Sequence, residues 1–434
     1  MKKLTIKLIL LIATSIFLPL KGVWGAAFAQ TAGTNSSYSR FGLGLLHDQS
    51  HGFSKSMGGA AIGVRIGNVV NTANPASYSA IDSLSLIFDV GMNAYFGKMR
   101  QGAKGVGING AGLDYVHAGM HLAKRLGLAV GFMPYTDIGY EYFTSKETIG
   151  SNAQSSMTNT HQESYIGSGG LTQAYLGLGW RAYRNLSVGA NISVLWGDYN
   201  HSVIPAYAEG GVYSDAYTYT AKLYQASLLT YKLDFGAQYP VRLSKQDWLN
   251  IGATFGLGHN LPQDAEVSTG NRTDTISSPF SIPYTFGIGA AWQHKNTLHV
   301  AADVRHELWS KCSLPAVMAM ESGYKNMTMV AVGAQWTPNP LEKKYWKRIQ
   351  YRVGVSFTTP YLRVNGMNGP SELSLRGGVG LPITNRTNNR SVINFGLQWM
   401  RRSASGTGML KEDYLLLNLG ITFNERWFMK YKIE

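Results

Sequence analysis

The side chains that could do chemistry form two polar rows. His117 and His121 lie four residues apart in one row, and His299, Asp303 and Arg305 form the other. On β-strands, residues four apart are separated by about 13 Å, which is too far to share a metal ion or to pass a proton directly. The chain also lacks a G-x-S-x-G nucleophile motif. The rows therefore predict a polar wall, and we expect no enzyme activity, metal or cofactor from them.

Two further motifs have ordinary explanations. Residues 105–110, GVGING, match the G-x-G-x-x-G pattern of dinucleotide sites, but no helix follows that could receive a pyrophosphate. We interpret this run as a glycine-rich loop with a turn at Asn109-Gly110. The single cysteine, Cys312, has no disulfide partner within the chain and no metal-site spacing. Neither motif predicts a cofactor.

Alternating side chains surround these motifs. In residues 84–96, large apolar residues occupy one row and mostly small or polar residues the other, as in a strand with one face in lipid. Fourteen such segments, each near the length of about 9–11 residues of a tilted membrane strand, give the even count of a bacterial barrel. The segments are 84–96, 112–122, 126–133, 173–181, 186–196, 228–240, 248–257, 284–292, 297–305, 327–336, 350–357, 373–381, 392–400 and 414–423.

The connections and the composition favour the same fold. Short connections such as 123–125 and 182–185 alternate with long ones such as 134–172 and 197–227, as in barrels with tight periplasmic turns and long outer loops. Only 15% of the residues are charged, against about a quarter in soluble domains. A soluble sandwich or propeller would carry polar residues on the rows that are apolar here. The predicted fold class is an all-β transmembrane antiparallel β-barrel of about 14 strands.

The N-terminus predicts export. Three lysines precede an apolar stretch at 8–20, and Ala27-Phe28-Ala29 forms a cleavage site. We therefore expect a signal peptide at 1–29 and a barrel in the outer membrane of a Gram-negative bacterium. The formal charge of +14 is spread over many connections without a basic helix, so nucleic acid is not an expected partner.

A plug is predicted ahead of the first strand. Residues 57–81 are rich in Gly and Ala and have no clean period of 2 or 3.6. Pro75 lacks an N–H and pushes Asn74 out of the helical region, so we expect a turn there. We assign 30–82 to an N-terminal extension and lumen plug, or hatch, and 83–434 to the barrel. The expected hatch residues are Gly58, Gly59, Asn74, Pro75 and Ala76.

Two segments carry a family resemblance. Gly58-Gly59-Ala60-Ala61 followed by Asn74-Pro75-Ala76, and the segment 283–310 with its LHVAADV strand and closing Trp-Ser, resemble the FadL/TodX-like family of outer-membrane transporters for long-chain fatty acids and aromatic hydrocarbons. The resemblance implies a monomeric barrel with a hatch. An apolar ligand would be caught by outer loops, bind inside, and leave sideways into the membrane lipid beside an inward-kinked third strand.

The resemblance places that third strand at 126–133. Gly127, Gly131 and Pro134 are the expected kink, because Gly and Pro weaken strand pairing, although an ordinary strand end explains them equally well. The expected capture surface lies in the loops 134–172 and 197–227, with ordinary loop packing as the alternative. Its candidate residues are Val203, Ile204, Pro205 and Tyr207.

A different function on the same barrel stays open. Residues 30–53 are longer than a hatch requires, and such a barrel can instead serve secretion or dock a periplasmic or surface protein without a small ligand. A transporter should have a dry internal pocket and a lateral gap, whereas a docking barrel should keep a closed wall. A hydrolase at the rim would need His and Ser or Asp brought together from different strands. Passive uptake of hydrophobic small molecules is the function we expect.

Overall fold

The computed structural model describes residues 36–426 except 84, 150–157, 210–211, 215–220, 314–321, 365, 384–389 and 407. The predicted signal peptide at 1–29 lies outside the described residues. Among the residues described, no helix has both the length and the apolar composition needed to cross a bilayer.

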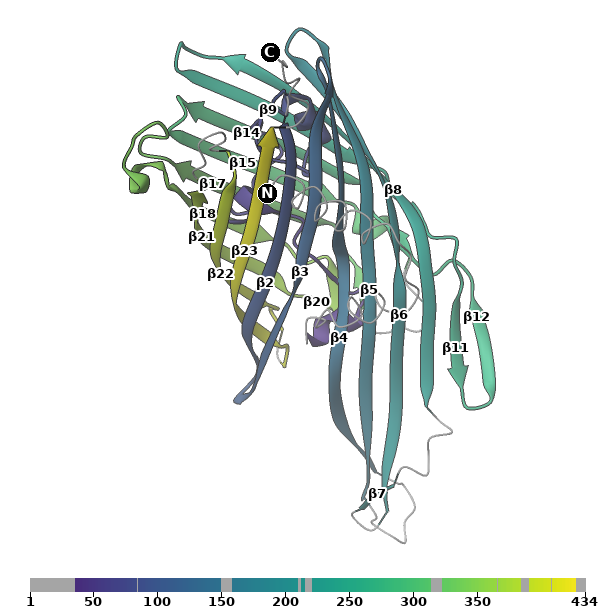
Figure 1. Ribbon diagram of the computed structural model, residues 1–434. Coiled ribbons are helices and arrows are strands. Elements are labelled where there is room, and N and C mark those ends of the chain that lie inside the picture. Colours follow the sequence, from purple (N-terminus) through teal and green to yellow (C-terminus); the bar gives the residue numbers. More distant parts are fainter. Residues whose placement is uncertain are drawn as a thin grey trace, which may run out of the picture.

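Fourteen antiparallel strands form a closed barrel (Figure 1). Each strand pairs with its neighbour along the chain, and the last strand pairs with the first, from Ser85↔Arg426 to Arg100↔Lys411. The strands are β2 (Ser85–Gln101), β3 (Lys104–Ala123), β4 (Leu126–Ile149), β5 (Thr158–Tyr183), β6 (Leu186–Glu209), β8 (Lys222–Arg242), β9 (Asp247–Gly256), β14 (Thr285–His294), β15 (Leu298–Glu307), β17 (Met327–Trp336), β18 (Gln350–Thr358), β21 (Ser371–Pro382), β22 (Val392–Ser403) and β23 (Lys411–Arg426). All fourteen predicted strands are confirmed.

The two faces of the wall differ as the alternation predicts. Leu176, Ile192 and Val353 are 51%, 60% and 62% exposed on the outer face. Polar neighbours such as Asn191 and Arg352 are buried on the inner face. The barrel therefore presents apolar rows outward and keeps its polar groups inside.

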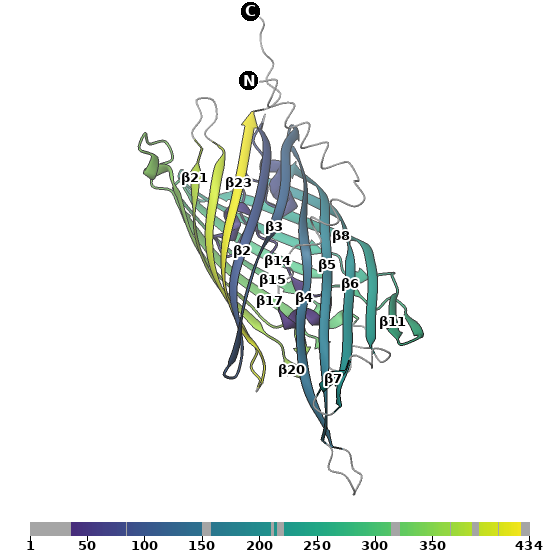
Figure 2. The ribbon, with the colours of Figure 1, turned by 60° about the horizontal axis from the view of Figure 1, so that its bottom comes forward.

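Several strands are longer than predicted. The longest, β4, β5, β6 and β8, have 24, 26, 24 and 21 residues, against about 9–11 for a tilted membrane strand, and Figure 2 shows β4, β5 and β6 projecting beyond the other strands. The predicted loops 134–172 and 197–227 are therefore largely wrong, because most of their described residues are strand. Beyond the short segments predicted, the apolar row changes face: Ile138 and Tyr140 are buried inside. A search for outward apolar rows misses strands of this kind.

The glycine-rich run 105–110 is also strand. It lies in β3 and pairs with β2, from Gly105↔Arg100 to Gly110↔Tyr95, so the predicted turn at Asn109-Gly110 is wrong. The β2–β3 turn falls instead at residues 102–103, where Gly102 has a positive φ of 59°.

Residues 36–82, called the inner segment below, lie within the barrel (Figure 1). They contain η1 (Ser37–Arg40), β1 (Leu45–Leu46), α3 (Gly52–Lys55) and η2 (Pro75–Ala80). One apolar cluster joins Phe53, Met57 and Val64 of this segment to Ala301 and Ala331 of the wall. The segment has little regular structure, and its contacts with the wall and its own hydrogen bonds, such as those of the Asn71 amide to the Ala61 and Val64 carbonyls, hold it in shape.

Glycines of the wall make room for the inner segment. A Cβ added at Gly127 would overlap the carbonyl oxygen of Tyr78, and one added at Gly354 would overlap the backbone nitrogen of Gly58. Because any side chain there would collide with backbone, these positions require glycine. We call the wall glycines that contact inner-segment backbone in this way the glycine belt: Gly127, Gly179, Gly189, Gly252, Gly333 and Gly354.

Candidate binding cavity and wall gap

The ladder between β3 and β4 stops partway along the wall. Its pairs run from Ala123↔Leu126 to Val116↔Phe132, and no further β3–β4 pair occurs among the described residues. Beyond that point β3 pairs only with β2, whereas β4 keeps its pairing with β5 through an irregularity between Pro134 and Thr136. We call this part, β3 from 104 to 115 facing β4 from 133 onward, the wall gap.

The inner segment pairs with the β4 edge of the gap. β1 adds a short antiparallel strand there, with Leu45 opposite Asp137 and Leu46 opposite Thr136. The His47 N–H donates to the Tyr135 carbonyl at 3.0 Å, and the Gln49 side-chain amide donates to the Pro134 carbonyl at 3.0 Å. Backbone groups that β3 would have paired are thus satisfied by a segment that is not part of the barrel.

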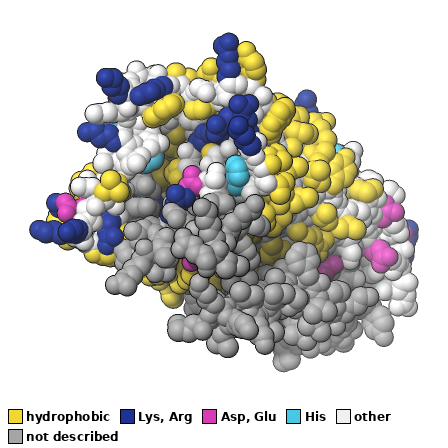
Figure 3. Space-filling model, turned by 45° about the horizontal axis from the view of Figure 1, so that its top comes forward, with side chains coloured by type: hydrophobic (Ala, Val, Ile, Leu, Met, Phe, Trp, Pro, Cys, Tyr) yellow, Lys and Arg dark blue, Asp and Glu magenta, His cyan; other side chains and the backbone are white. Residues whose placement is uncertain are grey.

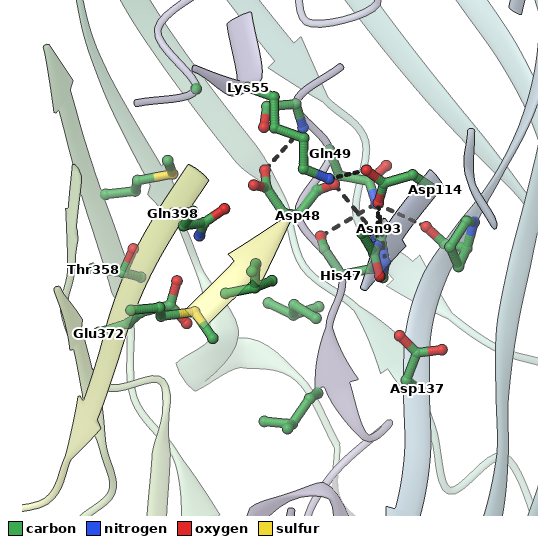
Figure 4. A pocket seen from close by; sticks show the side chains of 18 of the residues that line it. His47, Asp48, Gln49, Lys55, Asn93, Asp114, Asp137, Thr358, Glu372 and Gln398 are labelled. Carbon is green, nitrogen blue, oxygen red and sulfur yellow. Dashed lines mark hydrogen bonds and ion pairs between the residues drawn. The ribbon is translucent and has the colours of Figure 1, made fainter. Parts of the chain in front are cut away.

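A cavity of about 240 Å³ opens onto this gap. Its lining includes Ala111 and Gly112 from the β3 edge and Tyr135 and Asp137 from the β4 edge. One part of the wall is apolar, and another carries charged side chains (Figure 4). The apolar part includes Leu45, Leu46, Met327, Met329, Tyr361 and Leu362.

Several charged side chains of the cavity form ion pairs. Lys55 of α3 pairs with Asp114 of β3, and both are buried. Figure 4 shows Asn93 beside them, and its amide donates to Asp114 at 2.8 Å. His47 Nε2 lies 3.6 Å from the same carboxylate. The pair joins the inner segment to the β3 side of the wall gap.

A second ion pair ties the inner segment to the opposite wall. Arg376 of β21 donates to Asp48 at 2.6 Å. Burial would raise the pKa of the Asp48 carboxyl, but Arg376 and Lys55 outweigh it and hold that pKa below its ordinary value. Asp48 is therefore ionised at neutral pH. These two ion pairs, together with Arg402–Glu372 at 2.9 Å, offset part of the charge that lines the cavity.

The predicted hatch residues meet the wall closely. The Asn74 amide donates to the carbonyls of Ile62 and Ala237 at 3.0 and 3.1 Å and accepts from the Ala76 N–H at 3.1 Å. Pro75 is the first residue of η2, and Ala76 is fully buried. Gly58 and Gly59 have positive φ values of 71° and 85°, and a Cβ added at Gly58 would meet the wall backbone at Val355.

The predicted kink residues have separate roles. Gly127 belongs to the glycine belt, and Gly131 makes room for the rings of His117 and Tyr175. The irregularity in β4 occurs at Pro134, which has no N–H to give to the ladder. Of the three, Pro134 lies at the wall gap and lines the cavity.

The predicted capture residues are not in a loop. Val203, Ile204, Pro205 and Tyr207 lie on β6 and pair with residues 161–165 of β5. The loop assignment is therefore wrong, because pairing with β5 and β8 extends β6 beyond the segment that the alternation identifies.

Two residues of the predicted polar rows, Asp303 and His121, contact the inner segment. Asp303 accepts from the N–H groups of Ala61 and Ile62 at 2.5 and 2.7 Å. His117 contacts Tyr175, with 3.0 Å between Nδ1 and the hydroxyl oxygen, and does not meet His121, which contacts the Ile81 carbonyl. The described residues contain no cluster of His, Cys, Asp and Glu that could hold a metal ion.

Solved structures share this architecture at low sequence identity. The CymD monoaromatic hydrocarbon channel is 13% identical, covers 90% of this chain and 100% of its own, and has a TM-score of 0.55. A Pseudomonas aeruginosa FadL homologue is 9% identical over 87% and 99% of the two chains, with a TM-score of 0.56. The P. putida toluene transporter TodX is 15% identical over 88% and 100%, with a TM-score of 0.52. The protein is thus a barrel of the FadL/TodX-like fold.

The structural likeness shows the fold, and comparison of the sequence with family models shows the family. The BamG family model matches residues 6–434. The chain belongs to the BamG family. No curated protein matches it in sequence.

Proposed function

We propose that the protein is an outer-membrane channel for passive uptake of hydrophobic or amphipathic small molecules. The observation that carries this proposal is the position of the cavity, which is lined by both edges of the wall gap. A ligand in the cavity lies next to a part of the wall without a β3–β4 ladder. The fold supports the proposal, because its neighbours include proteins described as a monoaromatic hydrocarbon channel and a toluene transporter.

The apolar outer rows support a membrane location for the barrel. In this proposal the inner segment is the hatch, and residues 83–434 are the barrel. Ligand enters the cavity from the end where the long strands project, and leaves sideways through the wall gap at Pro134 after β1 separates from β4. Each buried methylene contributes about 0.8 kcal/mol to ligand binding, so an apolar chain can enter without energy coupling. No enzymatic step is involved.

A cysteine pair tests the exit route. Leu45→Cys with Asp137→Cys, in a Cys312→Ser background, would tie β1 to the edge of β4, because the two residues are direct partners. With oleate and toluene as probes, we expect the oxidised protein to lose uptake at least tenfold and dithiothreitol to restore it. Leu45→Cys alone in the same background is the matched control. Unchanged uptake by the oxidised pair would contradict exit through the wall gap.

The second candidate function is a docking barrel for another protein. The projecting strands β4, β5, β6 and β8 favour it, whereas the incomplete β3–β4 ladder favours the channel. Native mass spectrometry after gentle extraction from the native membrane separates the two. A co-released apolar mass of a few hundred daltons supports the channel, and an empty barrel with a stoichiometric protein partner supports docking.

A further inference from the structure

The two ends of the barrel differ in charge. The described part of the end with the short turns carries mostly basic side chains (Figure 3). The described part of the other end mixes both signs. The described acidic side chains at the short-turn end include Asp247 and Glu342. The basic residues in or beside the short turns are Lys124, Arg125, Arg181, Arg184, Arg242, Lys245, Lys295, Lys343, Lys344, Lys347, Arg348 and Arg390.

One of these connections, residues 337–349 between β17 and β18, is built differently from the others. It contains η5 (Tyr345–Arg348) and projects beside the barrel (Figure 1). Backbone hydrogen bonds fix its shape, with the Thr337 N–H donating to Thr297 at 2.7 Å and the Asn339 N–H to Lys347 at 2.8 Å. The Tyr345 hydroxyl donates to the Pro382 carbonyl at 3.1 Å. The connection is therefore an ordered surface.

This ordered surface presents large apolar side chains to solvent. Leu341 is 93% exposed and Trp346 is 56% exposed. Trp336 and Tyr351, on the strands that flank the connection, continue the exposed apolar surface of the barrel wall. In water such exposure is unfavourable, because each fully buried side chain of this size gains about 1.5–3 kcal/mol. A lipid interface removes that cost, and Trp is enriched at such interfaces.

Two lysines on the same surface have no carboxylate partner among the described residues. Lys347 pairs with Glu342 at 3.3 Å and lies over the Trp346 ring. Lys343 and Lys344 are exposed, and neither has an ion-pair partner among the residues that the structure describes. Two free ammonium groups therefore lie within a few residues of an exposed Leu and an exposed Trp.

We propose that residues 337–349 bind the headgroup of an anionic phospholipid in the leaflet at the short-turn end, an inference that rests on the proposed membrane location. Lys343 and Lys344 meet the phosphate, and Leu341 and Trp346 enter the apolar region beneath it. A lipid supplies negative charge and hydrocarbon side by side. An acidic protein surface would match the lysines but would leave Leu341 without an apolar partner.

Lipid binding to the purified full-length protein tests this. Native mass spectrometry in detergent, with phosphatidylglycerol or phosphatidylcholine added, should show a preference for phosphatidylglycerol. Lys343→Glu with Lys344→Glu should reduce phosphatidylglycerol binding about tenfold. The matched control, Lys98→Glu with Lys104→Glu, reverses two charges near the β2–β3 turn at the opposite end and should leave that binding unchanged. Leu341→Ser should weaken binding of both lipids.

The assignment would be overturned if the wild-type protein bound phosphatidylglycerol and phosphatidylcholine equally well. It would also be overturned if both charge-reversal variants lost phosphatidylglycerol binding to the same extent. A third contrary result would be an acidic protein that co-purifies with the wild-type protein from the native membrane but not with the Lys343→Glu, Lys344→Glu variant. Oleate uptake is measured on the same variants. Normal uptake with lost lipid preference is the expected combination. If the wild-type protein takes up no oleate but still prefers phosphatidylglycerol, the channel proposal is wrong and the assignment of a headgroup site stands.

Discussion

Asn74→Ala should release the inner segment without unfolding the barrel. The Asn74 side chain is fully buried and makes two hydrogen bonds within the inner segment, one to β8 and a longer one, of 3.4 Å, to the Ala253 carbonyl of β9. Each of the three shorter bonds contributes about 1 kcal/mol net, so their loss costs about 3 kcal/mol. A change of that size shifts the equilibrium between docked and undocked states about 10²-fold.

Planar-bilayer conductance is the direct assay. The wild-type channel should open rarely, and Asn74→Ala should raise the fraction of time in the conducting state about 10²-fold, up to saturation. Protease cleavage within residues 36–82 should rise by a similar factor, while the heat-dependent shift in electrophoretic mobility that reports a folded barrel stays unchanged.

Asn185→Ala is the matched control. The Asn185 amide makes a single hydrogen bond, to Pro240 at 3.3 Å, in an exposed turn, so neither conductance nor cleavage should change. If Asn74→Ala conducts like the wild-type protein and resists protease equally, the inner segment is not held by these bonds. If the barrel unfolds together with the segment, the two do not move separately and the hatch mechanism is wrong.

Three further predictions concern the same segment. Gly127→Ala should expose residues 36–82 to protease, because the new Cβ overlaps the backbone of η2, whereas Gly107→Ala, which meets open space, should not. Lys55→Met or Asp114→Leu alone should destabilise docking by about 3–5 kcal/mol, and the double variant should recover most of that loss, as measured by a double-mutant cycle. Burial lowers the pKa of His51 to about 4; because the exposed imidazole binds more protons between about pH 4 and 6.5, docking should be strongest above pH 6.5 and weaken by about 2 kcal/mol at pH 5. His51→Gln should remove that pH dependence of cleavage, and equal slopes for both proteins would contradict it.

The barrel was predictable because alternation is a local signal. Every strand with an outward apolar row was identified, since lipid on one face and polar groups on the other repeat every two residues. The extensions of β4 and β6 were not predicted. Their apolar residues, such as Tyr140, face the interior, so they do not show the pattern of apolar residues outside and polar residues inside. Strand pairing, which sequence alone does not show, decides those extensions.

The cavity was less predictable for a different reason. Lys55 meets Asp114, and Asp48 meets Arg376 from 328 residues away. No local pattern records such contacts. The one usable signal was a charged residue on the polar row of a strand, which marks Asp114 and Arg376 as inward-facing but does not name their partners. The Asn74-Pro75 turn was predictable, because its chemistry is contained in adjacent residues.

The glycine belt has a consequence for how the chain reaches its final state. Its members come from β4, β5, β6, β9, β17 and β18, so the surface that receives residues 36–82 does not exist until most of the sheet has formed. Residues 36–82 must therefore wait for strands as late as β18, which begins more than 250 residues after them. Contacts between residues so far apart in sequence form slowly, because the chain loses loop-closure entropy before the contacts stabilise it. The barrel is the template and the inner segment the late addition, so a chain without residues 36–82 should still assemble the fourteen-stranded wall.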